Sequence, residues 1–455
     1  MSRLRAFRIT HCLISLVCAA VLFWRSTVPS ADAGTVGWAY LGYQPSWIAV
    51  GFAAVSIALA ALSAWNMTMG AIAVSMMAFG IPRYSAELQF AWDNGFQLVI
   101  ISLSLMGSLH SRPFRRHLLQ AWQRRDTWLR LLLAVTVWAT VCEAVALFFG
   151  RELAGPKHHL LRTIESAMTL VVVFAFLSNR RSYLVLVASA IASIAFVTAQ
   201  LDEIERASDY AFSIAPFACL LAGTATSLSW PGMLVFFSAA TCCSFLSIGT
   251  ASRAANVGLL CGLCSLILAK LRSVRSIAVV SALLAASLFF ALASPLRPRI
   301  DQWMEAGWDT PTLASRMQFW RATVSHIPQN GIFGVGPGRG GKQMSSELEL
   351  SKWKATHSSP FEILEEQGIV GCLLWCVLLA IGLRSARRGS RSENKFVSAI
   401  AIAIGCSLIT VAVNSLAISR HDDMRLYWLL GLSFAVETLS HRENDNVALE
   451  TSLNQ

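Results

Sequence analysis

The chain has 455 residues, of which 55% are hydrophobic and only 14% are charged, and its mean hydropathy is +0.55. A soluble globular domain carries about 25% charged residues, so this composition excludes one. The net charge of +11 does not indicate a nucleic-acid partner, because the basic residues form short clusters between apolar segments rather than one groove or tail. We expect a membrane protein that contacts lipid and binds no nucleic acid.

Apolar segments of about 18 residues, the length that crosses the hydrocarbon core of a bilayer, recur along the chain. Lipid cannot satisfy backbone polar groups, and the segments lack the alternation of a barrel strand, so each one predicts a helix. The expected fold is an all-α, polytopic transmembrane protein with about twelve spans, and about fourteen at most. The candidate spans lie near residues 8–24, 47–65, 67–81, 95–110, 131–150, 161–178, 183–199, 211–228, 231–249, 255–270, 276–294, 363–383, 396–418 and 425–440.

The first apolar segment follows Arg3, Arg5 and Arg8, and the small residues around Asp32 after it resemble a cleavage site. A signal peptide is one interpretation. We favour an uncleaved first helix, because in a polytopic protein this segment also serves as the first span.

Basic residues cluster in alternate connections between the predicted spans: Arg112 to Arg125, Arg180 with Arg181, Lys270 to Arg275, and Arg384 to Lys395. Lys and Arg are enriched on the cytoplasmic side, so these connections and both termini are expected there. The long connection then faces the periplasm of a bacterial inner membrane. The predicted parts are N-terminal spans over 1–293, a periplasmic loop with short helices over 294–360, C-terminal spans over 361–440, and a cytoplasmic tail over 441–455.

Ionisable residues within the predicted spans are few, and Glu143 and Glu165 are the clearest. In a proton-coupled transporter such carboxylates would form a relay, whereas isolated ones are more often structural. No internal repeat is evident, which weakens a transporter of the inverted-repeat kind. The 11 cysteines lie almost entirely in apolar segments and are expected to pack as small apolar side chains.

The loop over 294–360 is unusually rich in cations for a periplasmic connection. A solvated surface is one interpretation, because long loops partly escape the positive-inside tendency. The other is an anionic ligand, for which a pyrophosphate on a lipid carrier is the natural candidate at this surface. The basic residues are Arg297, Arg299, Arg316, Arg321, Arg339, Lys342, Lys352 and Lys354.

Residues Gly336 to Lys342 read GPGRGGK and fit most of the nucleotide-binding P-loop pattern. Gln343 replaces the Ser or Thr that would bind magnesium, and no buried β-strand precedes the motif. We therefore interpret it as a turn after Pro328, which closes the preceding helix.

His357 stands where the loop re-enters the membrane, beside the cation-rich segment, and could be a general base for a sugar hydroxyl. Glu365 and Glu366 are competitors, although in the first turns of a helix they more simply complement its dipole. His421-Asp422-Asp423 could ligate a divalent metal, but three adjacent residues do not converge easily on one ion. His158 and His159, on another connection, have no further support, and we expect no metal site.

Three segments taken together resemble the O-antigen ligase superfamily, which also contains O-antigen polymerases and bacterial O-linked oligosaccharyltransferases. The match is carried by Ser252 and Arg253 in SIGTASRAANVGLL, by Ser315, Arg316, Trp320, Pro328, Gly334 and Gly336 in SRMQFWRATVSHIPQNGIFGVGPG, and by His357, Glu366, Gly368 and Gly371 in HSSPFEILEEQGIVG. One departure is Ser358, where many members carry Asn.

The resemblance implies transfer of a lipid-linked glycan at the periplasmic face, without ATP, metal or another cofactor. His357 would deprotonate the acceptor hydroxyl, while Arg253 and Arg316 would hold the undecaprenyl pyrophosphate of the donor as the diphosphate leaves. Direct displacement by the hydroxyl implies inversion at the anomeric carbon. Local charge alone adds further possible substrate-binding residues, namely Arg321, Arg339 and Lys342.

Within the superfamily we favour an O-antigen ligase, whose acceptor is the lipid A-core oligosaccharide. O-antigen polymerase, whose acceptor is another carrier-linked glycan, is the alternative with the same chemistry. A protein acceptor is less favoured, because the tail after residue 440 is short and cytoplasmic by the predicted parity. A flippase or exporter of lipid-linked glycans is the alternative from another class, and the oligomeric state is left open.

Overall fold

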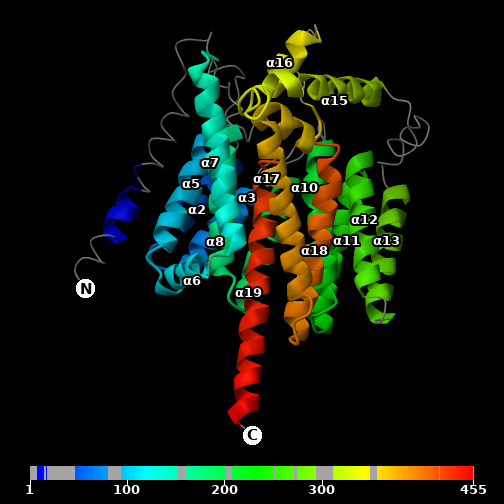
Figure 1. Cartoon of the computed structure of the whole chain (residues 1–455). Helices are drawn as coiled ribbons and strands as arrows, with labels where there is room; N and C mark the ends of the chain where they lie inside the picture. The colour runs from blue at the N-terminus through cyan, green and yellow to red at the C-terminus, as the bar shows by residue number, and fades with distance from the viewer. Residues whose placement is uncertain are drawn as a thin grey trace. The chain divides into compact units, whose positions relative to one another are not determined.

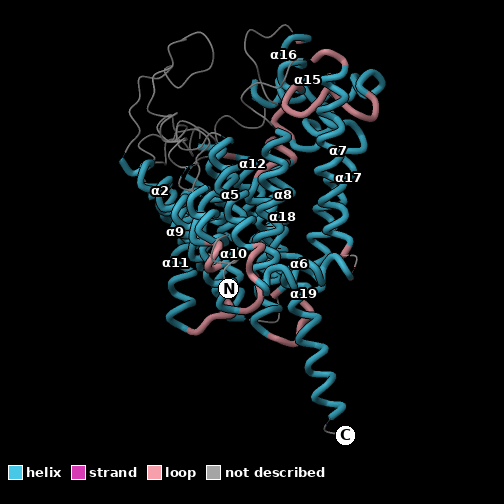
Figure 2. The backbone as a smooth tube through the Cα atoms, turned by 90° about the vertical axis from the view of Figure 1, so that its left-hand side faces the viewer, coloured by secondary structure: helices cyan, strands magenta, loops and turns pink. Residues whose placement is uncertain are grey.

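The computed structural model describes residues 8–14, 17, 47–79, 94–124, 126–151, 159–199, 207–249, 252–270, 274–293, 311–348, 356–419 and 421–453. Throughout these residues the backbone forms helices and loops, with no strand (Figure 2). Five of the described helices are long and apolar enough to cross a membrane, and shorter apolar helices accompany them. The all-helical fold is therefore confirmed, and the chain is a polytopic membrane protein; the number and direction of the spans stay predictions.

The chain divides into two compact units, Met1–Arg125 with Ile164–Ile204, and Asp126–Thr163 with Glu205–Gln455. Helix α8 (His159–Phe176) begins in the second unit and continues in the first. The first unit also contains helical residues 8–14 and the helices α2 (Trp47–Leu62), α3 (Met67–Phe79), α5 (Asn94–Ser108), α6 (Arg112–Gln123) and α9 (Arg180–Ala199).

Small residues let the helices of the first unit approach closely. A Cβ atom added at Gly70 of α3 would lie 2.7 Å from Ser108 Oγ, and one at Gly107 of α5 would lie 1.8 Å from Ser63 Oγ. Packing of this kind is favoured in membranes, where apolar side chains gain nothing from leaving the lipid. Glu165, one of the two predicted intramembrane acids, is fully buried here.

The second unit contains the other described helices (Figure 1). They are α7 (Thr127–Phe148), α10 (Ala207–Ala225), α11 (Trp230–Gly249), α12 (Arg253–Ala269), α13 (Val274–Ala293), α15 (Pro311–Asn330), α16 (Gly340–Glu347), α17 (Ser359–Gly389), α18 (Lys395–Ser415) and α19 (Met424–Leu453). Helix α18 packs against α10, α12, α17 and α19, and so lies at the centre of the unit. Helices α15 and α16 lie at one end of it, beyond the start of α17 (Figures 1 and 2).

Helices α12 and α18 run antiparallel in close contact. A Cβ atom at Gly258 would lie 1.9 Å from Asn414 Oδ1, and one at Gly262 would lie 2.0 Å from Thr410 Oγ1. Moving forward along α12 therefore means moving backward along α18. The N-terminus of α12 and the C-terminus of α18 thus meet at the same end of the unit.

The structure refines two expected segments. The loop before α17 was expected to hold short helices, but α15 has 20 residues, as many as a span, with a polar composition. Residues after 440 were expected to form a tail, whereas α19 continues as a helix to Leu453.

A candidate active site beside a buried histidine–carboxylate cluster

His357 is exposed, whereas its neighbours on both sides are buried. The carbonyl oxygen of Thr356 accepts a hydrogen bond from Trp320 Nε1 at 3.1 Å, and Ser359 Oγ donates one to the carbonyl of Ile418 at 2.8 Å. These contacts anchor the turn. The φ of His357 is 53°, in the left-handed region that non-glycine residues rarely adopt. Backbone strain of this kind is concentrated at functional sites, so the exposed imidazole is a candidate for chemistry.

Arg316 lies on α15, which packs against α17 through Trp320. The indole of Trp320 stacks on Phe361 with ring centroids 5.3 Å apart, and because Trp320 follows Arg316 by four residues, both face the same side of α15. Arg316 is half-buried, and its Nε has no hydrogen-bond partner in the part of the chain that is described. Burial lowers the pKa of its guanidinium. An anion is the ligand that would neutralise this charge.

Arg253 is the first residue of α12 and is half-buried. Five residues further along α12, Gly258 packs on Asn414, near the C-terminus of α18. Arg253 therefore lies at the same end of the unit as residues 418 and 419, which follow α18. Ser419 Oγ is 3.3 Å from Thr356 Oγ1, beside His357. The structure therefore brings Arg253, the face of α15 that carries Arg316, and His357 to one end of the second unit.

Helix α17 is interrupted at Gly368, whose φ of 68° and ψ of −170° are not helical. The interruption removes carbonyl oxygens from the helical ladder, and lipid could not satisfy them. Three accept hydrogen bonds of 2.9 Å from outside the helix: those of Glu365 from Val335 N–H, of Glu366 from Gly336 N–H, and of Gln367 from the Trp138 indole. The turn after α15 is thereby fixed to α17.

The first residues of the GPGRGGK segment form a turn, as predicted, and its last three residues belong to the next helix. Helix α15 ends at Asn330, and the φ angles of Gly336 and Gly338 are 96° and 79°, which only glycine adopts readily. Helix α16 then begins at Gly340.

Arg339, a possible phosphate ligand by local charge, is instead occupied within the protein. Its guanidinium forms a two-pronged ion pair with Glu143 of α7, and the Nη2–Oε1 distance is 2.8 Å. Both side chains are largely buried. The pair fastens the loop to α7 and gives Glu143 a structural role, while contact of Arg339 with substrate stays a prediction.

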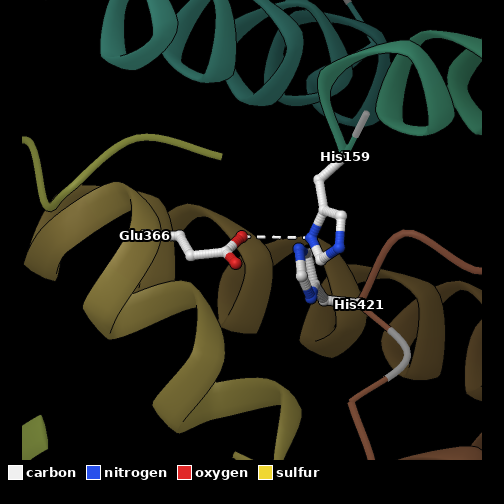
Figure 3. A group of neighbouring side chains, drawn as sticks. All are labelled: His159, Glu366 and His421. Atoms are coloured by element: carbon white, nitrogen blue, oxygen red, sulfur yellow. Dashed lines mark ion pairs between the residues drawn. The ribbon is translucent and has the colours of Figure 1, made fainter. Parts of the chain in front are cut away.

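A second group of ionisable side chains is buried along the first turns of α17. His159 from the start of α8, Glu366 from α17 and His421 from the α18–α19 connection face one another (Figure 3). Each offers a ligand atom, and these atoms all lie within 4.8 Å of one another. His159 Nδ1 is 3.1 Å from Glu366 Oε2. The arrangement could hold a metal ion or a set of protonated histidines.

Further charged groups surround this cluster. His421 Nδ1 is 3.2 Å from Glu362 Oε2, and Arg162 Nη1 is 3.8 Å from Asp422 Oδ2. Burial disfavours the imidazolium of His421, but Glu362 and Asp422 outweigh it and raise the pKa of that histidine. The cluster thus links one turn of α17 to two segments far from it in sequence.

The sequence reasoning did not find this cluster. It placed Glu365 and Glu366 at a helix dipole, whereas both are buried against histidines, Glu365 Oε1 lying 3.5 Å from His326 Nδ1. The available signal was the spacing of Glu362, Glu365 and Glu366, since residues three and four apart share one face of a helix. Of the remaining predicted residues, Arg321 is exposed, and the Lys342 side chain and all of His158 lie outside the described residues.

These features define a class: a polytopic helical membrane protein with a strained, exposed histidine and a half-buried arginine at one end of a helical unit. The Nε of that arginine has no hydrogen-bond partner among the described residues. Residues 236–376 match the model of the O-antigen ligase family. This segment contains Arg253, Arg316 and His357, and it is similar to glycan transferases of the O-antigen ligase type. The predicted resemblance is confirmed, and lipid-linked glycan donors and acceptors are the substrates that the family implies. Among curated proteins, no sequence matches the chain.

Proposed function

We propose that the protein is an O-antigen ligase, which transfers O-antigen polysaccharide from undecaprenyl pyrophosphate to the lipid A-core oligosaccharide at the periplasmic face of the inner membrane. The observation that carries this proposal is Arg316, a half-buried cation without a hydrogen-bond partner at Nε among the described residues, within the matched segment. A buried cation of this kind is stabilised by an anionic ligand, and the donor supplies a diphosphate.

The chemistry assigned to the site is one displacement. His357 takes the proton of the acceptor hydroxyl, whose oxygen bonds to the anomeric carbon of the donor sugar while the bond from that carbon to the diphosphate breaks. Attack from the face opposite the leaving group inverts the anomeric carbon. Arg253 and Arg316 stabilise the charge that develops on the departing diphosphate. The displacement itself is metal-independent.

The position of His357 suits this role. Its neighbours are fastened to α15 and to the α18–α19 connection, so the backbone that carries the imidazole is positioned before substrate binds. The turn directly precedes the apolar helix α17, so it marks a membrane boundary. A boundary site lets the polyprenyl tail stay in lipid while the sugars stay in water.

The test is replacement of His357 by Ala in cells that make O-antigen, with His441→Ala as the control, since His441 is an exposed histidine on α19. We expect the His357 variant to lose O-antigen from lipid A-core while long carrier-linked polymer accumulates, and the control to be unchanged. Loss of the long polymer itself would favour the polymerase reaction. Normal attachment of O-antigen to lipid A-core in the His357→Ala cells would refute the mechanism.

A further inference from the structure

The buried cluster of His159, Glu366 and His421 has the features of a cation site, and it is separate from the residues assigned to glycan transfer. We propose that these three side chains bind one divalent transition-metal ion, with zinc the best fit, that ties together α8, α17 and the α18–α19 connection. The proposal goes beyond the transfer reaction, because the ion does not touch the reacting atoms.

The distances are close to those that such an ion requires. Zinc lies about 2.0–2.2 Å from histidine nitrogen and carboxylate oxygen in tetrahedral sites, so neighbouring ligand atoms are about 3.4 Å apart. The separation of His159 Nδ1 and Glu366 Oε2 is 3.1 Å, and all three ligand atoms lie within 4.8 Å of one another. In Figure 3 the carboxylate and the two rings point toward the same small region.

The ligand atoms are buried, and their short contacts within the described residues fall outside hydrogen-bond geometry. His159, Glu366 and His421 are 6%, 1% and 3% exposed. His159 Nδ1, Glu366 Oε2 and both ring nitrogens of His421 have no hydrogen-bond partner within the described part of the chain, despite the short contacts. Buried polar atoms that converge without hydrogen bonds are costly, and a bound ion would offset that cost.

The groups around the cluster are arranged as a supporting shell. A metal-bound histidine usually gives its second ring N–H to a carboxylate, which fixes the ring. Glu362 lies 3.2 Å from His421 Nδ1 and can take this part, which leaves His421 Nε2 for the ion.

The carboxylates in and around the cluster leave two negative charges without a fixed positive partner. Glu362, Glu366 and Asp422 are carboxylates, and Arg162, 3.8 Å from Asp422, balances one of them. Two protons, one on each histidine, would balance the others, as would one divalent cation. Two imidazoles with one carboxylate select zinc and similar ions, because magnesium and calcium prefer oxygen ligands alone.

The ion would act as a positioning element. Glu366 lies on the part of α17 that follows His357, and His421 follows the residues that hold the His357 turn. A bond from each to one ion fixes the start of α17 against α8, where His159 is the first helical residue.

The test is the metal content of the full-length protein, purified in detergent, incubated with zinc and desalted. We expect about one zinc per chain in the native protein, and at least a fivefold loss in His159→Gln, Glu366→Gln and His421→Gln. His326→Gln is the matched control, because His326 is also paired with a buried glutamate of α17 but lies outside the three ligands. It should keep its zinc.

Two further measurements guard against a variant that simply fails to fold. Cobalt(II) added to the native protein should give the visible absorption of a tetrahedral site, and His421→Cys should add a thiolate-to-cobalt band. A chelator should lower the melting temperature of the native protein and leave that of Glu366→Gln unchanged. Absence of zinc from the native protein, or equal zinc in the native protein and all three ligand variants, would overturn the proposal in favour of protonated histidines.

Discussion

Arg316 and Arg321 belong to the same helix, α15, but differ in exposure: Arg316 is half-buried, whereas Arg321 faces solvent. Replacement by Gln should therefore affect transfer unequally. A hydrogen bond to a charged group is worth about 1.5–3 kcal/mol, so Arg316→Gln should slow transfer about 10- to 100-fold. Arg321→Gln should change it less than about threefold. Transfer from a purified lipid-linked donor to lipid A-core in nanodiscs measures both, and equal losses would remove the special role of Arg316.

Arg339 and Glu143 form a largely buried ion pair, so removing one partner leaves an uncompensated charge. Glu143→Gln or Arg339→Met alone should destabilise the protein by about 3–5 kcal/mol, and the double variant should recover a large part of this. Thermal unfolding in detergent measures the change.

The control for this pair is Arg388 with Glu437, of which Arg388 is 49% exposed. Glu437→Gln should change stability little, because exposed pairs contribute less than about 1 kcal/mol. If Arg339→Met instead left stability intact and abolished transfer, the result would support Arg339 as a substrate-binding residue rather than as part of a structural pair.

At this scale the sequence could indicate residue types but not their partners. Arg339 and Lys342 seemed equivalent in a cation-rich loop, and the partner of Arg339, Glu143, is 196 positions away. In the sequence, His159 could not be told apart from the other histidines, because the carboxylate that it contacts, Glu366, lies far away on α17. Long-range pairs leave no local pattern, whereas the strained His357 stood beside helix-start residues and a recognisable motif.

Among the helices, α17 shows most directly how a single residue determines geometry. Gly368 has a positive φ, and a Cβ atom there would lie 1.9 Å from the carbonyl oxygen of Ile332. Gly368→Ala should destabilise the protein by at least about 2 kcal/mol and reduce transfer, because the turn after α15 would be displaced. Gly51→Ala is the control: a Cβ atom there meets nothing within 4 Å, so it should stabilise α2 by about 0.5–1 kcal/mol. Melting temperatures with opposite shifts would bear out both expectations.

The positions of the apolar helices were predictable, since hydropathy alone placed segments such as 396–418 within a few residues of α18, Lys395–Ser415. The length of α15 was not predicted, although Leu313, Met317, Trp320, Val324 and Ile327 recur at spacings of three and four residues, as on one face of a helix. Its helix is held by packing on α17 through the stacked Trp320 and Phe361. Contact of this kind depends on tertiary structure rather than on local propensity.

For the molecule as a whole, the orientation in the membrane rests on the distribution of Lys and Arg. With the native cysteines replaced, a cysteine at Gln329 in the loop should react with a membrane-impermeant maleimide in intact spheroplasts. A cysteine at Ser390, among Arg387, Arg388 and Arg391, should react only after lysis. The reverse pattern would place the His357 turn on the cytoplasmic side and exclude transfer to lipid A-core.

The interruption of α17 also bears on how the protein is made. A helix with unsatisfied carbonyl oxygens is costly in lipid, and ribosomes produce a chain from its N-terminus. All three donors that satisfy these oxygens, Trp138 and the N–H groups of Val335 and Gly336, precede Gly368 in the sequence. The hydrogen-bond donors are therefore synthesised before the carbonyl oxygens that they satisfy. A nascent α17 can complete its hydrogen bonds as soon as it emerges, without waiting for α18 or α19.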